Sequence, residues 1–213
     1  MTAFKAVVFD AYGTLVHITQ PTNPYEQLFK LSSSGRSNAE NFRRAVMTNE
    51  GFIEEAAYLL GINASLDQIC HIKHMLNAEV GSVRVYEDVI PTLRDLQGAG
   101  IKIGLCSNLA EAYAIPIRED IPVAFDAMAL SFEVNAMKPD AAIYDALITQ
   151  LGCKAEEILF VGDSYHNDYI GPTAQGMAAL LLRRSTDLNP EWHRINSLSE
   201  VIARATGEIK IRM

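Results

Sequence analysis

Five short runs of consecutive apolar residues alternate along the chain with stretches whose apolar positions recur at helical spacing. Continuous apolar runs of this length are typical of strands buried on both faces, as in a parallel sheet. Helical patterns extend from about Glu87 to Ala99 and from Pro139, in the first turn, to near Gly152. This alternation predicts an α/β fold with helices on both faces of a parallel sheet. The runs are Ala6 to Phe9, Ile101 to Cys106, Ala127 to Leu130, Ile158 to Val161 and Ala178 to Leu182.

Residues 18–85 interrupt the alternation, because they show helical periodicity without a convincing strand. Ser65 and Gln68 have the spacing of a capping box at the start of a helix. We therefore predict a small all-helical insertion over 18–85, with residues 1–17 and 86–213 forming the core. The insertion would lie over the carboxyl end of the first strand.

Polar residues follow three of the apolar runs, at the points where the predicted strands end. They are Asp10 to Thr14, Ser107 with Asn108, and Gly162 to Ser164, while Lys138 opens a helix between the last two. Each alone has an ordinary explanation as a turn former or a helix cap. The carboxyl ends of parallel strands lie at one edge of the sheet, so all four elements in this order indicate a functional site.

Composition narrows the class of partner. Apolar residues make up 49% of the chain and charged residues 21%, which is the balance of a folded globular protein. The formal charge of −8 argues against binding nucleic acid or an anionic membrane surface through bulk electrostatics. We expect a small-molecule substrate instead. The sequence does not specify an oligomeric state.

The three cysteines, Cys70, Cys106 and Cys153, are widely spaced and odd in number. This spacing predicts neither a disulfide framework nor a thiolate zinc site and favours a reducing, cytoplasmic setting. No apolar leader with a small-residue cleavage site follows the start of the sequence, and no stretch approaches the ~20 apolar residues that span a bilayer.

Four motifs resemble those of the haloacid dehalogenase superfamily, in order and spacing, over nearly the whole chain. They are FDAYGTL at 9–15, CSN at 106–108, KPD at 138–140 and VGDSYHND at 161–168. The resemblance implies a hydrolase with a Rossmann-like core, and the helical insertion resembles the cap domain of one large subgroup. It also implies that Asp10 is a nucleophile and that Lys138 is the cation beside it. Thr14, Ser107 and Asn108 match positions that bind the substrate.

The same resemblance implies a magnesium site formed by Asp10, the main-chain carbonyl of Tyr12, Asp163 and, through water or from further out, Asp168. Mg²⁺ prefers oxygen ligands, often one or two carboxylates with water and phosphate. An aspartate that attacks a phosphate dianion meets like-charge repulsion, which a metal ion and an ammonium group would reduce.

Tyr12 departs from the phosphatase pattern, in which a second aspartate protonates the leaving group. Loss of a general acid typically costs ~10² to 10⁴ in rate, and tyrosine, with an unperturbed pKa of ~10, is a poor replacement. The same FDAYGTL motif resembles that of 2-haloacid dehalogenases, whose halide leaves without a proton. Those enzymes use no metal, and a cap arginine receives the halide; Arg36, Arg43 and Arg44 are candidates by region.

We give the carboxylates more weight than Tyr12, because three carboxylates at one strand edge are costly without a shared cation. The expected function is Mg²⁺-dependent hydrolysis of a small phosphorylated metabolite. The alternatives are a metal-independent 2-haloacid dehalogenase and a catalytically weak ligand-binding protein.

Overall fold

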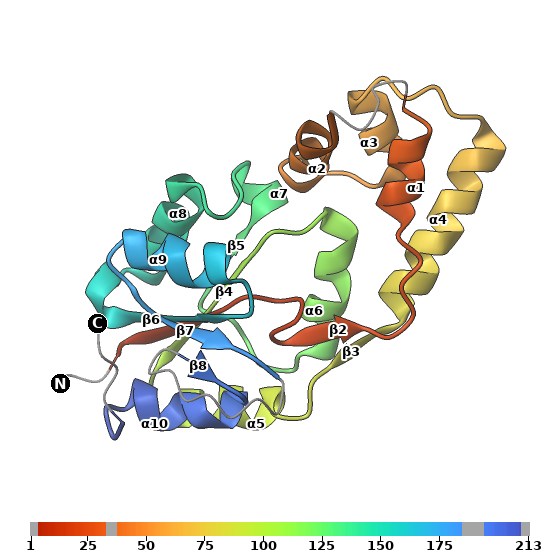
Figure 1. Cartoon of the computed structure of the whole chain (residues 1–213). Helices are drawn as coiled ribbons and strands as arrows, with labels where there is room; N and C mark the ends of the chain where they lie inside the picture. Colours follow the sequence, from red (N-terminus) through yellow and green to blue (C-terminus); the bar gives the residue numbers. More distant parts are fainter. Residues whose placement is uncertain (1–3, 33–37, 185–193, 210–213) are drawn as a thin grey trace.

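The core of the protein is a six-stranded sheet in the order β5-β4-β1-β6-β7-β8, in which all neighbouring strands are parallel (Figure 1). The computed structural model describes residues 4–32, 38–184 and 194–209. The five apolar runs form β1 and β4 to β7, which confirms the predicted α/β fold. The strands are β1 (Ala6–Phe9), β4 (Lys102–Ser107), β5 (Ala127–Leu130), β6 (Ile158–Gly162), β7 (Ala178–Leu182) and β8 (Arg194–Ile195).

Helices cover both faces of this sheet, because the side chains of each strand alternate between two hydrophobic clusters. In β1, Val7 and Phe9 face one cluster, whereas Ala6 and Val8 face the other. Figure 1 shows α8 and α9 on one side of the sheet and α5 and α10 on the opposite side. The core helices are α5 (Val89–Gly98), α6 (Ile115–Asp120), α7 (Ser131–Val134), α8 (Ala141–Leu151), α9 (Gly171–Ala174) and α10 (Val201–Ala205).

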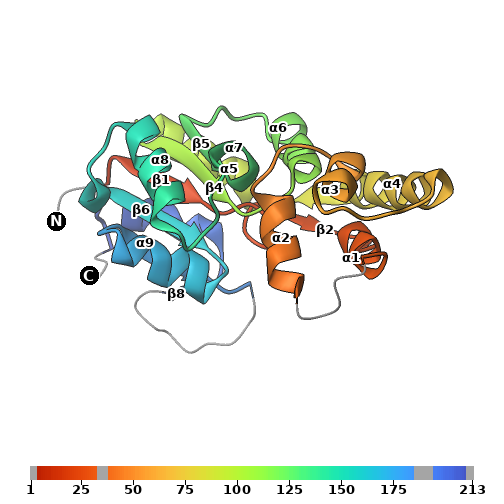
Figure 2. The ribbon, with the colours of Figure 1, turned by 90° about the horizontal axis from the view of Figure 1, so that it is seen from above.

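Four helices between β2 and β3 form a third hydrophobic cluster and lie beside the core in Figure 2. We call them the insertion helices: α1 (Pro24–Lys30), α2 (Ala39–Met47), α3 (Ile53–Leu59) and α4 (Leu66–Gly81). Two short antiparallel strands that the sequence did not predict, β2 (Val16–Ile18) and β3 (Val83–Val85), lie at the two ends of this segment. Each has only three residues and its partner is distant in the chain, so neither produces a visible alternating pattern.

Two helix starts test the sequence-based boundaries. At α4, the Ser65 hydroxyl accepts a hydrogen bond from the Gln68 N–H at 3.2 Å, and the Gln68 side chain accepts one from the Ser65 N–H at 2.8 Å. The predicted capping box is therefore confirmed. The prediction that Pro139 lies in the first turn of a helix is wrong, because α8 begins at Ala141 and Asp140 is its N-cap. Within the described residues, no helix is long and apolar enough to cross a membrane.

Replacing Ser65 by alanine removes the side-chain acceptor at the start of α4. We expect Ser65→Ala to lower the free energy of unfolding by about 0.5–2 kcal/mol, measured by urea denaturation monitored by circular dichroism. Ser65→Asp is the matched control, because aspartate caps helices as well as serine does. Equal losses in the two variants would contradict the capping role.

Candidate active site

The carboxyl end of β1 lies between the ends of β4 and β6, because β1 pairs with both strands. Asp10 follows β1 directly, and its N–H donates to the Val161 carbonyl at 3.0 Å, which extends the pairing with β6 by one residue. Ser107 ends β4, and Asp163 follows Gly162 at the end of β6. The sheet order therefore brings together three of the polar sequence elements, as strand ends on both sides of a central strand are expected to do.

Lys138 reaches this edge from the segment before α8 and is only 2% exposed. Its ammonium donates to Asp10 Oδ1 at 2.7 Å, to Asp168 Oδ1 at 2.6 Å and to the Cys106 carbonyl at 2.8 Å. Three acceptors match the three N–H donors of an ammonium group. Burial acts to lower the pKa of Lys138, but the charges of Asp10 and Asp168 outweigh it and raise that pKa. Lys138 is therefore a fixed positive charge beside Asp10.

Asp10, Asp163 and Asp168 form what we call the carboxylate cluster, since one oxygen from each lies within 4.8 Å of the others. Burial raises the pKa of Asp163, and the charge of Asp10 acts in the same direction. Burial also raises the pKa of Asp168, which is 1% exposed. The cluster sets three carboxylates against one ammonium group, so negative charge is in excess even with Lys138 present. An all-oxygen donor set with excess negative charge fits a hard divalent cation such as Mg²⁺.

Two glycines make room for the cluster. Gly13 has a positive φ of 86°, and a Cβ there would overlap the Asp163 carboxylate. A Cβ at Gly162 would overlap the Asp168 carboxylate in the same way. Both positions therefore require glycine, because the backbone approaches the carboxylates too closely for any side chain.

The other residues with predicted substrate-binding roles differ in their surroundings. The Asn108 amide accepts from the Lys138 N–H at 2.7 Å and donates to the Lys138 carbonyl at 2.8 Å, so it clamps the main chain that carries the ammonium. The Thr14 hydroxyl is buried and has no hydrogen-bond partner among the described residues. A buried unpaired hydroxyl is costly unless a ligand satisfies it. Ser107 is buried at the end of β4.

Tyr12 is held away from acid–base chemistry. Its hydroxyl donates to the Tyr113 carbonyl at 2.9 Å, and its ring meets the Tyr113 ring edge-on at 5.6 Å. Burial raises the pKa of Tyr12, and the charge of Glu79 acts in the same direction. At neutral pH the phenol is therefore a weaker acid than free tyrosine.

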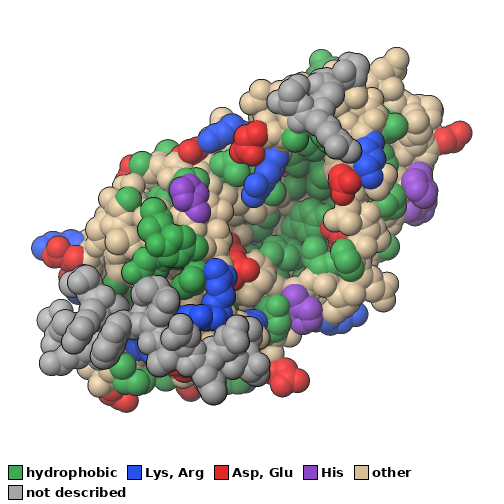
Figure 3. All heavy atoms as spheres, viewed as in Figure 1, with side chains coloured by type: hydrophobic (Ala, Val, Ile, Leu, Met, Phe, Trp, Pro, Cys, Tyr) green, Lys and Arg blue, Asp and Glu red, His purple; other side chains and the backbone are tan. Residues whose placement is uncertain are grey.

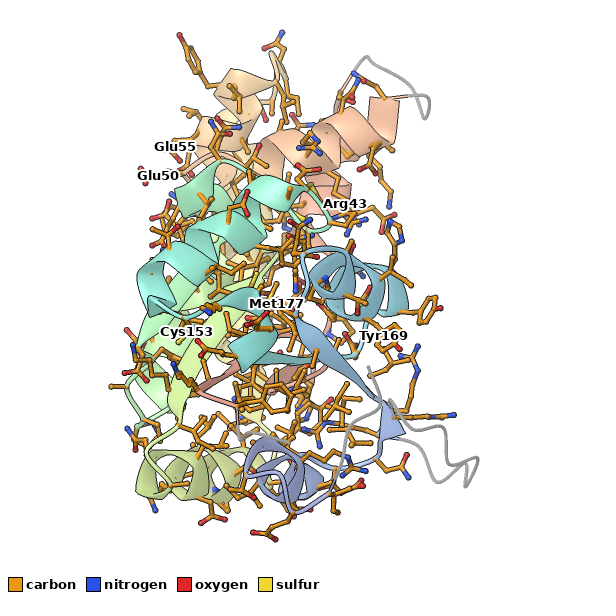
Figure 4. The ribbon with its side chains drawn as sticks, turned by 90° about the vertical axis from the view of Figure 1, so that its left-hand side faces the viewer. Arg43, Glu50, Glu55, Cys153, Tyr169 and Met177 are labelled. Carbon is orange, nitrogen blue, oxygen red and sulfur yellow. The ribbon has the colours of Figure 1, made fainter. Side chains whose placement is uncertain are left out.

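The candidate arginines differ as well. Arg44 forms a bidentate ion pair with Asp140, with Nη1 at 2.9 Å from Oδ2, so its charge is already paired within the protein. Arg43 lines a cavity of about 440 Å³, and Figure 4 shows it between α2 and the core. Arg36 lies outside the described residues. Figure 3 shows the cavity as a hollow lined with hydrophobic side chains between the core and the insertion helices.

Sequence reasoning missed two arginines at the same edge of the sheet. Arg184 donates to the Thr14 carbonyl at 2.7 Å and pairs with Asp88 at 3.0 Å, while Arg183 donates to the Asp163 carbonyl. Both follow β7 directly. Their position after the fifth apolar run, at the carboxyl end of a predicted strand, is the sequence feature that could have indicated them. No sequence motif marks these two positions.

The chain belongs to the haloacid dehalogenase-like hydrolase family, whose model matches residues 4–174. The chain is similar to the glyceraldehyde 3-phosphate phosphatase of Methanothermobacter thermautotrophicus, with 32% identity over 63% of this chain and 61% of that protein. It thus aligns with about three fifths of that relative's length. The (S)-2-haloacid dehalogenase of Pseudomonas fluorescens is 25% identical over 77% of this chain and 78% of its own.

Among solved structures, a HAD phosphatase from Thermococcus onnurineus superimposes with a TM-score of 0.64 and 25% identity, covering 95% of this chain and 98% of the other. The family and the α/β fold expected from the four motifs are both confirmed. The relatives include both phosphatases and a dehalogenase, as the conflict between the first and fourth motifs indicated.

Removing the Lys138 charge should leave two buried carboxylates without their shared partner. We expect Lys138→Met to lower the free energy of unfolding by about 3–5 kcal/mol, the usual cost of breaking a buried ion pair on one side. Urea denaturation with a chelator present would measure it. Lys154→Met, at a side chain that is 76% exposed, is the control and should change little. Equal stability of both variants would disprove the dependence of the cluster on Lys138.

Proposed function

We propose that this hydrolase removes phosphate from a small phosphorylated molecule with Mg²⁺ as cofactor. The observation that carries the proposal is the carboxylate cluster around the Lys138 ammonium. Three carboxylates and one ammonium leave a net negative site, and repulsion of this kind is relieved when a divalent cation binds. A metal-independent reaction gives no physical reason for Asp163 and Asp168 to lie beside Asp10.

In this proposal Asp10 is the nucleophile. One of its oxygens attacks phosphorus, a phosphorus–oxygen bond to Asp10 forms, and the bond to the leaving group breaks with its electron pair on the departing oxygen. Water then attacks phosphorus, the bond to Asp10 breaks, and the electron pair returns to the carboxylate. From an acyl phosphate and one water, the products are a carboxylate and dihydrogen phosphate.

The surrounding residues would orient the phosphoryl group and offset its charge. The Lys138 ammonium donates to Asp10 Oδ1 and orients that carboxylate, and Asn108 fixes the main chain of Lys138. The unpaired Thr14 hydroxyl and Ser107 would donate to phosphoryl oxygens. Asp10, Asp163 and the Tyr12 carbonyl would hold the metal, with Asp168 acting through water or from further out, and the bound metal would supply charge neutralisation for an attack between two anions.

The insertion helices would act as the cap that selects the substrate, with 18–85 as cap and 1–17 with 86–213 as core. The ion pair between Arg44 on α2 and Asp140 in the core supports this arrangement, because it joins the two segments next to Lys138. A cytoplasmic location stays a prediction; Cys70, Cys106 and Cys153 are all free thiols.

A 2-haloacid dehalogenase is the second candidate, and a specific observation favours it. Tyr12 offers no carboxylate to protonate a leaving group, and Arg43 lines the cavity next to it without an ion pair within the described residues. We rank it second because a metal-free reaction gives no reason for a third carboxylate, Asp163, to lie beside Asp10 and Asp168.

Phosphate release from acetyl phosphate tests the proposal. We expect turnover that requires Mg²⁺, stops on addition of a chelator, and is lost in Asp10→Asn, because an amide does not form the aspartyl intermediate. Colorimetric phosphate detection measures the rate, and circular dichroism confirms folding of the variant. Asp145→Asn, on α8 away from the site, is the control. Halide release from 2-chloropropionate that persists in chelator would replace the proposal by the second candidate.

The presence of Tyr12 in place of a carboxylate predicts which phosphate esters the enzyme hydrolyses. Acyl phosphates and activated aryl phosphates should react faster than alkyl phosphates, because an alkoxide with a conjugate-acid pKa near ~15 needs a proton that Tyr12 does not supply. The missing acid is worth about 3–5 kcal/mol, or ~10² to 10⁴ in rate. A plot of log kcat/KM against leaving-group pKa should therefore be steep.

Tyr12→Asp should raise kcat/KM for alkyl phosphates and change activated substrates less. Tyr12→Phe is its control, since it removes only the hydrogen bond to Tyr113. A shallow slope in the wild type would overturn the prediction, because it would mean that another group already protonates the leaving oxygen.

A further inference from the structure

The cavity beside the site adjoins the proposed nucleophile through two of its own lining residues. Tyr12 lies two positions after Asp10, and Asn108 clamps Lys138. The opposite wall comes from α1 and α2 of the insertion, through Phe29, Phe42 and Val46 among others. A group leaving from a phosphorus atom at Asp10 would therefore enter this cavity.

Polar side chains in the cavity wall are largely committed to bonds within the protein. The Tyr12 hydroxyl donates to the Tyr113 carbonyl, and the Tyr113 hydroxyl donates to Glu79 at 2.6 Å. The second oxygen of Glu79 accepts from the Asn23 N–H at 2.7 Å and from Thr22. These groups have little capacity left for the hydroxyls of a ligand.

Three polar side chains of the wall have no hydrogen-bond or ion-pair partner within the described residues, those of Asn23, Tyr25 and Arg43. The Tyr25 hydroxyl is buried without a partner, and burial raises its pKa, so it stays protonated. Asn23 and Arg43 are exposed, so water competes with a ligand for the Asn23 amide and screens the Arg43 charge. One buried hydroxyl is too little to replace the water around a polyhydroxylated group, whereas an apolar group needs no such replacement.

Resting on the proposed phosphohydrolase function, we propose that the substrate's leaving group is apolar, either aromatic or branched aliphatic, and that this cavity binds it. The volume of about 440 Å³ lies within the range of small-molecule sites. The rings of Phe29 and Phe42, whose centroids lie 4.9 Å apart, offer one side of such a site, and Val46 is a buried neighbour on α2. Sugar phosphates and short hydroxy-acid phosphates would be poor substrates.

Phosphonates test the cavity without turnover, because their phosphorus–carbon bond is not hydrolysed. We expect benzylphosphonate to bind the Mg²⁺-loaded protein about tenfold to a hundredfold more tightly than methylphosphonate or phosphonoacetate, by isothermal titration calorimetry. Equal or tighter binding of phosphonoacetate would overturn the proposal, because it would show that Arg43 selects a carboxylate.

Val46→Thr keeps the shape of the side chain and adds a hydroxyl to the wall. It should weaken benzylphosphonate binding about fivefold to fiftyfold and leave methylphosphonate binding unchanged. Leu59→Thr is the matched control, because Leu59 is half-exposed on α3 and does not line this cavity. Thermal unfolding checks that both variants fold. Equal effects of Val46→Thr on both phosphonates would place Val46 outside the binding surface and contradict the proposal.

The acetyl phosphate assay separates this inference from the proposed function. Mg²⁺-dependent turnover of acetyl phosphate without a benzyl preference would refute the apolar cavity and leave the phosphohydrolase intact. Benzylphosphonate preference without any phosphate release would refute the phosphohydrolase and leave the cavity with an apolar ligand. Absence of binding by all three phosphonates together with absence of phosphate release would refute both.

Discussion

The site depends on the ion pairs that the Lys138 ammonium forms with Asp10 and Asp168. This buried positive charge allows the two carboxylates to lie together. A carboxylate removed from water is stable only when paired and hydrogen-bonded. The main chain of Lys138 is in turn held by the Asn108 amide at 2.7 and 2.8 Å. The end of β4, the segment before α8 and the carboxylates after β1 and β6 are thus joined through one side chain.

A second set of bonds fixes the insertion helices to the core. Glu79, at the end of α4, is a buried carboxylate that accepts from the main chain before α1 and from the Tyr113 hydroxyl in the core. Tyr113 in turn accepts from Tyr12. The position of the residue that departs from the phosphatase pattern is therefore set by the same bonds that hold the insertion in place.

Local patterns in the sequence predicted β1 and β4 to β7, the capping box at Ser65 and the strand ends that meet at Asp10, because each depends on neighbouring residues or on a general property of parallel sheets. The rest depends on tertiary packing. The pairing of β2 with β3, the start of α8 at Ala141 and the contacts of Arg184 with Thr14 and Asp88 involve residues distant in the chain or a backbone conformation that no periodicity encodes. The CSN motif marked Asn108 as a substrate-binding residue, but in the structure its side chain hydrogen-bonds to the main chain of Lys138.

The ion pair between Arg44 and Asp140 has a mechanical consequence. Asp140 lies two residues after Lys138 and is the N-cap residue of α8, so the ion pair ties α2 to the short segment that carries the ammonium. The cavity wall formed by α2 and the segment that positions the buried cation are therefore linked at the protein surface by one ion pair.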